Sequence, residues 1–203
     1  MKINDLIKKR VAIAEKCIIE LNKSGDLKNL SEMEKYKISG FYEEKSKNRL
    51  ETAKIIYNAS KNNEGYKDYS EVVSAAYYSM YYIVHAFLAL NYKTKLREGL
   101  RGVHAITEYI ILYYLVKTKK LAKHLFEEYF KTFETAAQIQ KINIEDFQEE
   151  AYGYVKKYNK SRSAREIFTY NIAANIEEYH AKQAINEAEE FINRIRQLMI
   201  LIH

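Results

Sequence analysis

The strongest pattern along the chain is the segment 74–90, SAAYYSMYYIVHAFLAL, which is almost wholly apolar or aromatic. Small residues alternate there with bulky ones. At 3.6 residues per turn, this spacing predicts a helix that is buried on most of its circumference. Ser70 is the expected N-cap of this helix, and Leu90 lies near its expected end. We therefore expect the segment to form the centre of a helical bundle.

Helical periodicity also covers the part of the chain that precedes this segment. Residues 3–22 carry apolar positions at alternating spacings of four and three, which predicts one amphipathic helix, and Gly25 is its expected stop. The sequence of 31–34, SEME, indicates a capping box. It should open a second long helix that ends near Ser60 and is bent or broken near Gly40. The expected core positions of this helix are Leu50, Ala53, Ile56 and Tyr57.

The part that follows predicts further helices. Residues 91–102 are basic and contain two glycines, so they form a connection. Helices are expected over 103–117, 122–140 and 144–158, and a last one from 175 to near the C-terminus. Its core stripe is Ala181, Ala184, Ile185, Ala188, Phe191, Ile192 and Ile195.

These elements predict an all-α protein built as an up-and-down helical bundle. Residues 1–35 would form an N-terminal helical extension, and residues 36–203 the bundle itself. The composition agrees, because the chain has no proline, six glycines and 47% hydrophobic residues. It contains no glycine-rich phosphate loop.

Cysteine and histidine usage limits the possible chemistry. Cys17 is the only cysteine, so an internal disulfide and a cysteine zinc site are excluded. No His/Glu spacing indicates a metal site, and we expect neither a metal nor a cofactor. The N-terminal sequence lacks the apolar core of a signal peptide, and the apolar runs fall short of an uninterrupted membrane span. We therefore expect a cytoplasmic protein without a membrane partner.

The net charge of +6, with a pI of about 9.1, permits an anionic partner such as RNA. It does not require one, because solvated helix faces of lysine-rich proteins carry the same surplus.

Three segments together resemble a known family. Residues 75–90, AAYYSMYYIVHAFLAL, are similar to the YYAMFHAAKALL helix of HEPN domains (higher eukaryotes and prokaryotes nucleotide-binding). Residues 164–170, AREIFTY, followed by the helix over 184–192, resemble the AR…ADY motif and closing helix of that family. The sequence of 103–106, VHAI, matches the start of its third bundle helix, and the resemblance covers about residues 40–198.

The resemblance implies a four- or five-helix bundle, commonly a homodimer. Many such domains pair with a minimal nucleotidyltransferase as toxin and antitoxin, and several are metal-independent endoribonucleases. This chain has no GS-x-D-x-D transferase motif, so it would be the partner of the transferase.

The ribonuclease members of the family carry an arginine and, after four to six intervening residues, a histidine. The histidine titrates near neutrality and moves the proton, and the arginine balances the charge on the phosphorane. Arg165 is present here, but Tyr170 and its two successors occupy the histidine positions, and Arg162 has no such histidine either. The motif is therefore degenerate.

Three functions remain open. The first is a nucleotide- or RNA-binding partner of a transferase. The second is a metal-independent endoribonuclease in which Arg165 holds the phosphate and His104 replaces the missing histidine. The third is a non-catalytic dimeric scaffold, in which Arg165 pairs with a carboxylate and Tyr170 packs between helices.

The candidate binding residues lie mainly in 156–165, which hold five basic residues and one tyrosine. They would grip a phosphate backbone while the tyrosine stacks on a base, or they form a solvated helix end. The candidates for nucleotide or RNA binding are Lys156, Lys157, Tyr158, Lys160, Arg162, Arg165 and Tyr170. His104, at a helix start near Arg97 and Arg101, is a catalytic candidate, whereas His85 is expected to be a core histidine.

Overall fold

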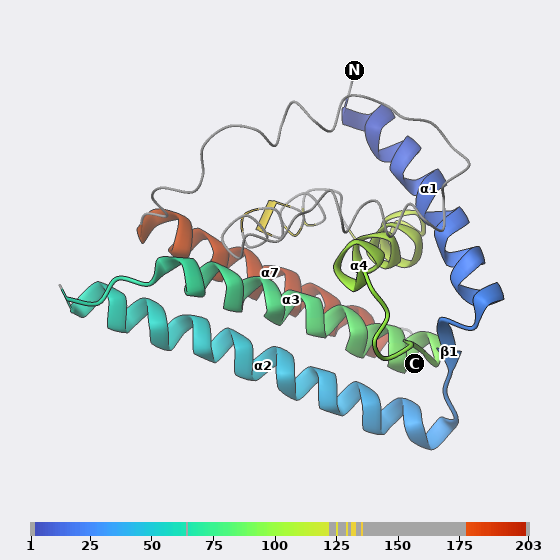
Figure 1. Ribbon diagram of the computed structural model, residues 1–203, viewed down its shortest axis with the longest axis horizontal. Helices are drawn as coiled ribbons and strands as arrows, with labels where there is room; N and C mark the ends of the chain where they lie inside the picture. Colours follow the sequence, from blue (N-terminus) through green and yellow to red (C-terminus); the bar gives the residue numbers. More distant parts are fainter. Residues whose placement is uncertain are drawn as a thin grey trace.

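The computed structural model describes residues 3–63, 65–121 and 178–201, and the single positions 125, 129, 131, 132 and 135. Within these residues, five helices pack as a bundle (Figure 1). This confirms the predicted all-α class. The helices are α1 (Ile3–Ser24), α2 (Glu32–Asn62), α3 (Tyr69–Tyr92), α4 (Val103–Ile111), which the π-helical turn η1 (Leu112–Val116) continues, and α7 (Glu178–Leu201).

Helices α2, α3 and α7 lie side by side (Figure 1). Polar contacts show that α7 runs antiparallel to α2. The hydroxyl of Tyr57, late in α2, donates to Glu178 at the start of α7 over 2.9 Å. Arg196, late in α7, pairs with Glu43, early in α2, over 3.4 Å. The predicted core stripe of α7 is buried at every position, because the helix lays that stripe against α3.

A row of small residues brings α2 and α3 together. Ser39, Ser46, Ala53 and Ser60 recur every seven residues on α2, and all four are buried. The hydroxyl of Ser46 donates to the carbonyl of Ser79 on α3 over 2.7 Å. A seven-residue repeat keeps one face of a helix turned toward a neighbouring helix. Side chains this small allow the two backbones to approach closely. Of the predicted core positions, Ala53 is fully buried, whereas Leu50, Ile56 and Tyr57 are half-buried.

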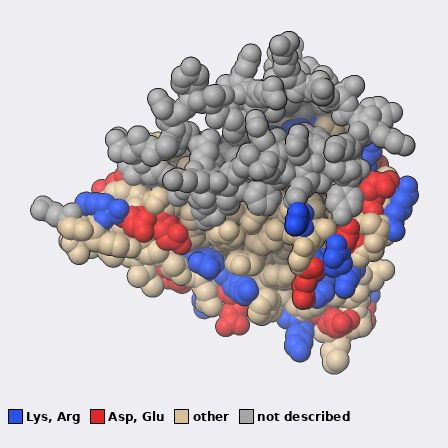
Figure 2. Space-filling model, viewed as in Figure 1, with Lys and Arg blue, Asp and Glu red and all other residues tan. Residues whose placement is uncertain are grey.

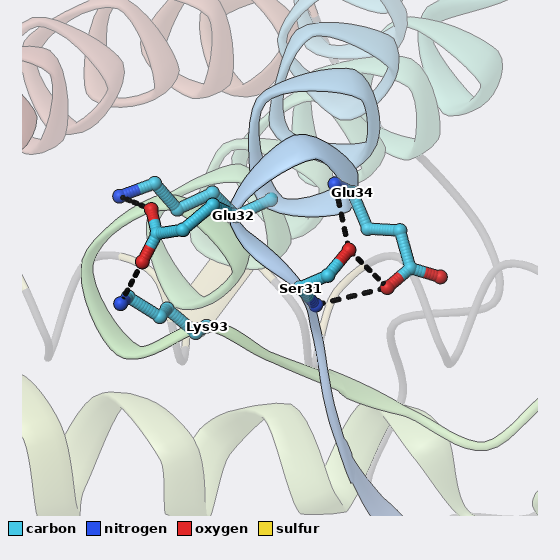
Figure 3. Close-up of polar contacts among 5 residues, drawn as sticks. Ser31, Glu32, Glu34 and Lys93 are labelled. Atoms are coloured by element: carbon cyan, nitrogen blue, oxygen red, sulfur yellow. Dashed lines mark hydrogen bonds and ion pairs between the residues drawn. The ribbon is translucent and has the colours of Figure 1, made fainter.

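The capping box predicted at the start of α2 is confirmed (Figure 3). The backbone amide of Glu34 donates to the Ser31 hydroxyl oxygen, and the Ser31 amide donates to the Glu34 carboxylate over 2.9 Å. The neighbouring Glu32 forms ion pairs with Lys35 and with Lys93 at the end of α3. These two ammonium groups lower the pKa of Glu32 to about 2. The start of α2 is thus fixed to the end of α3.

Two local predictions for α2 and α3 are wrong. Gly40 does not bend or break α2, because one glycine costs a long and well-packed helix only about 1 kcal/mol. Ser70 does not cap α3. The N-cap is Asp68, whose carboxylate accepts from the amide of Glu71 over 3.1 Å, while the Ser70 hydroxyl donates to the same carboxylate.

The segment 91–102 is not a plain connection. Its strand β2 (Thr94–Leu96) pairs antiparallel with β1 (Leu27–Asn29), which joins α1 to α2. The amide of Arg97 donates to the carbonyl of Asp26 over 2.8 Å, and the Arg97 guanidinium pairs with the Asp26 carboxylate over 2.6 Å. Strands this short, so far apart in the sequence, give no alternating pattern that would predict them.

Helix α1 shares the core of the bundle. Ala14, Cys17, Ile18 and Leu21 are buried in the same cluster as residues of α3, α4 and α7, and Gly25 ends the helix at a φ of +72°. The residues predicted as an N-terminal extension therefore pack directly on the predicted bundle, against α4 and η1.

Helix α3 is long and apolar enough to cross a membrane by length and composition, which the sequence analysis did not expect. Within the protein, 83% of its most apolar 18-residue window is buried. Among the described residues, it is the central core helix, as predicted, and Met80, Ile83, Phe87 and Leu88 are fully enclosed.

Candidate functional site

Two rows of side chains meet along the edge between α2 and α3. On α3, tyrosines stand in two pairs one turn apart, at 77–78 and 81–82, and His85 follows one turn later. On α2, Phe41, Lys45 and Arg49 are also spaced by one turn each. Residues four apart lie on the same side of a helix, so each set forms a row. We call the surface formed by Phe41, Tyr42, Lys45, Arg49, Tyr78, Tyr81 and Tyr82 the aromatic face.

The rings of the aromatic face contact one another across the two helices. Tyr42 on α2 stacks on Tyr82 on α3, with a centroid distance of 6.1 Å and an interplanar angle of 22°. Phe41 meets Tyr42 edge-on at 5.5 Å. Tyr78 and Tyr81 each contact Tyr82, at 6.3 Å and 5.3 Å. The contacts therefore form a continuous chain of rings from Tyr81 through Tyr82 and Tyr42 to Phe41.

Two cations lie over these rings. The Lys45 ammonium is 4.5 Å from the ring centroid of Phe41 and 5.3 Å from that of Tyr82. The Arg49 guanidinium is 5.8 Å from the ring centroid of Tyr78. Neither side chain forms an ion pair with any residue that the structure describes. A cation near a ring face is attracted by about 0.5–1 kcal/mol at an exposed site and keeps its charge for other partners.

The aromatic face is open to solvent to different degrees. Phe41 is 52% exposed, and Lys45 and Arg49 are also exposed. The tyrosines at 42, 78, 81 and 82 are half-buried. Burial raises the pKa of Tyr42 and of Tyr81, which keeps both hydroxyl groups protonated at neutral pH. The face therefore offers uncharged rings and two positive charges.

His104, the one predicted catalytic residue that the structure describes, lies beneath this face. Its Nδ1 is 2.7 Å from the Tyr77 hydroxyl, and its ring is 4.9 Å from that of Tyr81. Burial lowers the pKa of His104 to about 4. The imidazole is therefore neutral at pH 7 and is a poor proton donor there. Of the two arginines predicted near it, Arg97 is paired with Asp26.

His85 is a core histidine, as predicted. The Thr107 hydroxyl donates to the carbonyl of Val103 over 2.7 Å, so it accepts from the Nε2–H of His85 over 3.0 Å. This contact fixes the neutral tautomer of the ring. Burial, helped by the nearby His104, lowers the pKa of His85 to about 3.

A buried carboxylate lies one turn after His104. Glu108 is 5% exposed and pairs with Arg10 of α1 over 2.5 Å. Burial raises the pKa of this carboxyl, and the Arg10 charge opposes that rise. On the other side of Tyr77, the buried ring of Tyr129 lies at 5.9 Å and stacks on Phe191 of α7. The residues near Tyr77 and His104 therefore include a buried ion pair and buried aromatic rings that contact one another.

The remaining predicted site residues lie outside the described residues. They are Lys156, Lys157, Tyr158, Lys160, Arg162, Arg165 and Tyr170. Whether Arg165 and His104 lie close together therefore stays a prediction. Within the described part of the chain, no group of three or more His, Cys, Asp or Glu side chains could hold a metal ion.

Sequence reasoning missed the aromatic face, because it assigned the tyrosines of α3 to the core and named no residue of α2 as functional. The available signal was the four-residue spacing of Phe41, Lys45 and Arg49. Such a row is visible in the sequence, but only the pairing of α2 with α3 shows that it meets Tyr78 and Tyr82.

The described surface has no large patch of one charge in the view of Figure 2, where basic and acidic side chains alternate. Comparisons with protein-family models, with curated proteins and with solved structures found no match.

Proposed function

We propose that this chain is a nucleotide- or RNA-binding helical bundle of the HEPN type that partners a minimal nucleotidyltransferase and has no catalytic activity of its own. The single observation that supports binding is the aromatic face, where Lys45 and Arg49 lie over half-exposed rings. Rings stack on bases and cations attract phosphates, so this combination suits a nucleotide or RNA. The HEPN type and the transferase partner rest on the resemblance of 75–90 and 164–170.

The state of the histidines favours binding over cleavage. A ribonuclease that works by proton transfer needs a group that titrates near neutral pH. His104 is held neutral by burial and His85 is engaged with Thr107, so neither meets this need. Incubating a labelled RNA with excess protein in EDTA tests the point. Intact RNA is expected, whereas cleavage that is lost in Arg165→Ala would overturn the proposed lack of activity.

Binding is tested by fluorescence anisotropy with a labelled single-stranded RNA and, in parallel, with labelled AMP and ATP. Saturable binding that weakens with salt supports the proposal. Absence of binding to all of these probes at low salt would refute it and favour the scaffold.

The partner is tested in cells that naturally express the chain. A tagged copy should co-purify with a protein that carries the GS-x-D-x-D transferase signature, in a fixed stoichiometry. Recovery of the chain without such a protein would refute the pairing. Sedimentation equilibrium on the purified chain tests the proposed homodimer, and a monomer at all concentrations would contradict it.

A further inference from the structure

We propose that the aromatic face holds the unpaired bases of a single-stranded nucleic acid, with Phe41 as the outermost stacking ring and with Lys45 and Arg49 on neighbouring phosphates. This inference rests on the proposed nucleotide or RNA binding and names the form of the ligand and the residues that hold it.

The arrangement of rings favours stacking. Phe41 keeps 52% of its surface exposed although a large apolar side chain gains by burial, so it is available to a planar ligand. Behind it, Tyr42 and Tyr82 are nearly parallel, and Tyr78 continues the row. These three tyrosines are half-buried and contact one another, so a base that stacks on them orders few side chains that are not already packed.

The spacing of the cations suits a chain of phosphates. Lys45 and Arg49 stand one turn apart, which is about 6 Å of helix rise. The Lys45 ammonium lies over the rings of Phe41 and Tyr82 and the Arg49 guanidinium lies over that of Tyr78, and neither is engaged by a carboxylate among the described residues. They therefore remain available to two successive phosphates whose bases stack alongside.

A single strand fits this face better than a duplex does. In a duplex the bases are stacked on one another and side-chain rings do not reach their faces, so proteins grip the duplex mainly through phosphates. The aromatic face itself carries two cations, Lys45 and Arg49, which is fewer than such a grip on a duplex requires. The face has five rings beside its two cations, so we expect stacking on bases to add to the phosphate contacts.

Self-association through the aromatic face is disfavoured by the same charges. A two-fold contact would bring Lys45 and Arg49 of one copy close to the same residues of the other. Like charges placed opposite each other cost free energy, and none of the seven residues that define the face is a carboxylate. The cations are instead complementary to an anionic ligand.

The test measures the affinity of the full-length protein for fluorescein-labelled oligonucleotides of about 12 nucleotides. The probes are a single-stranded RNA, the single-stranded DNA of the same sequence, and the corresponding RNA duplex. Because the face contacts bases and phosphates, both single strands should bind, and the duplex should bind roughly tenfold more weakly. The two single-stranded arms show whether the sugar also matters.

Two variants test the residues. Phe41→Leu keeps an apolar side chain but removes the ring, and should weaken single-strand binding roughly tenfold. The double variant Lys45→Gln, Arg49→Gln should reduce the slope of log K against log salt by about 1.4, which is 0.7 for each of two phosphate contacts. Met33→Ala and Lys47→Gln, exposed positions elsewhere on α2, are the matched controls and should change affinity by less than about twofold.

The outcomes separate the two proposals. Single-strand binding that is unchanged in Phe41→Leu and in the double variant, or equal binding of the duplex, overturns this inference and leaves the proposed function standing. Failure of the wild-type protein to bind any oligonucleotide or mononucleotide overturns both. Because all five positions are exposed, each variant should retain the wild-type circular dichroism spectrum and melting temperature.

Discussion

Mild acid should destabilise the protein through two histidines, His85, which is buried, and His104, which is half-buried. In an unfolded chain a histidine has a pKa near 6.5, whereas His85 titrates at about 3 and His104 at about 4 in the folded protein. Between pH 6.5 and pH 4 the unfolded chain therefore binds more protons than the folded chain. The free energy of unfolding rises with pH wherever this is so, and it falls as the solution is acidified through this window.

The size of the effect follows from the two pKa values. At pH 5 the unfolded form of each histidine is almost fully protonated and the folded form is almost fully neutral. Linkage then gives a loss of about 2 kcal/mol per histidine between pH 7 and pH 5, or about 4 kcal/mol for the pair. Glu108 acts in the opposite direction, because its raised pKa lets it take up a proton in the folded state as the pH falls. The total free energy of unfolding of a typical domain is only about 5–15 kcal/mol, so a loss of this size should be readily measured.

The assay is urea unfolding followed by circular dichroism at pH 7, 6 and 5 and constant ionic strength. His85→Gln retains a donor for the Thr107 hydroxyl but cannot titrate, so it should reduce the pH dependence to about half. His180→Gln, at an exposed position of α7, is the control and should leave the pH dependence as in the wild type. A free energy of unfolding that is the same at pH 7 and pH 5 would refute the reasoning.

Three further predictions concern stability and reactivity. Ser46→Leu should cost about 3 kcal/mol in urea unfolding, because a leucine has no room where Ser46 is fully buried, and Lys47→Leu on the exposed side should cost little. Arg10→Met should cost about 3 kcal/mol by leaving the buried Glu108 unpaired, and adding Glu108→Gln should recover most of the loss; equal stability of single and double variants would contradict this. Cys17 is fully buried and burial raises the pKa of its thiol to about 12, so it should react with a thiol reagent at pH 8 only at the rate of unfolding, and prompt reaction without urea would contradict the packing of α1.

Within the described residues, the sequence alone predicted most of the helices, because the signals of a helix lie close together in the sequence. The stop at Gly25, the capping box at Ser31 and the core stripe of α7 all depend on residues within a few positions of one another. The β1–β2 pair was missed because it depends on contacts between residues about seventy positions apart. The N-cap was misplaced because Asp68 and Ser70 are both good caps and only the backbone geometry selects Asp68.

For the site, the sequence correctly assigned His85 to the core. It did not predict that tyrosine rings cover much of His104 and that burial lowers its pKa. His104 is polar and stands at a helix start, which made it look accessible, yet the tyrosines of α3 lie against it on one side. The sequence did not predict the aromatic face for a related reason. A ring at helical core spacing gives the same signal whether its helix is covered or lies beside an open edge, and that difference is set by the neighbouring helix.

The small side chains that recur every seven residues on α2 are compatible with more than one register of α2 against α3. Sliding α2 along α3 by one repeat, about 10.5 Å, would bring another small residue to the place that Ser46 now occupies opposite Ser79. The row by itself therefore cannot distinguish one alignment from the next. The turn after α2 makes the distinction, since the amide of Asp68 donates to the Ser60 hydroxyl over 3.0 Å and Lys67 donates to the Ser60 carbonyl over 2.9 Å. The turn between α2 and α3 therefore sets the register of the two helices. This register determines which tyrosines of α3 lie beside Phe41, Lys45 and Arg49.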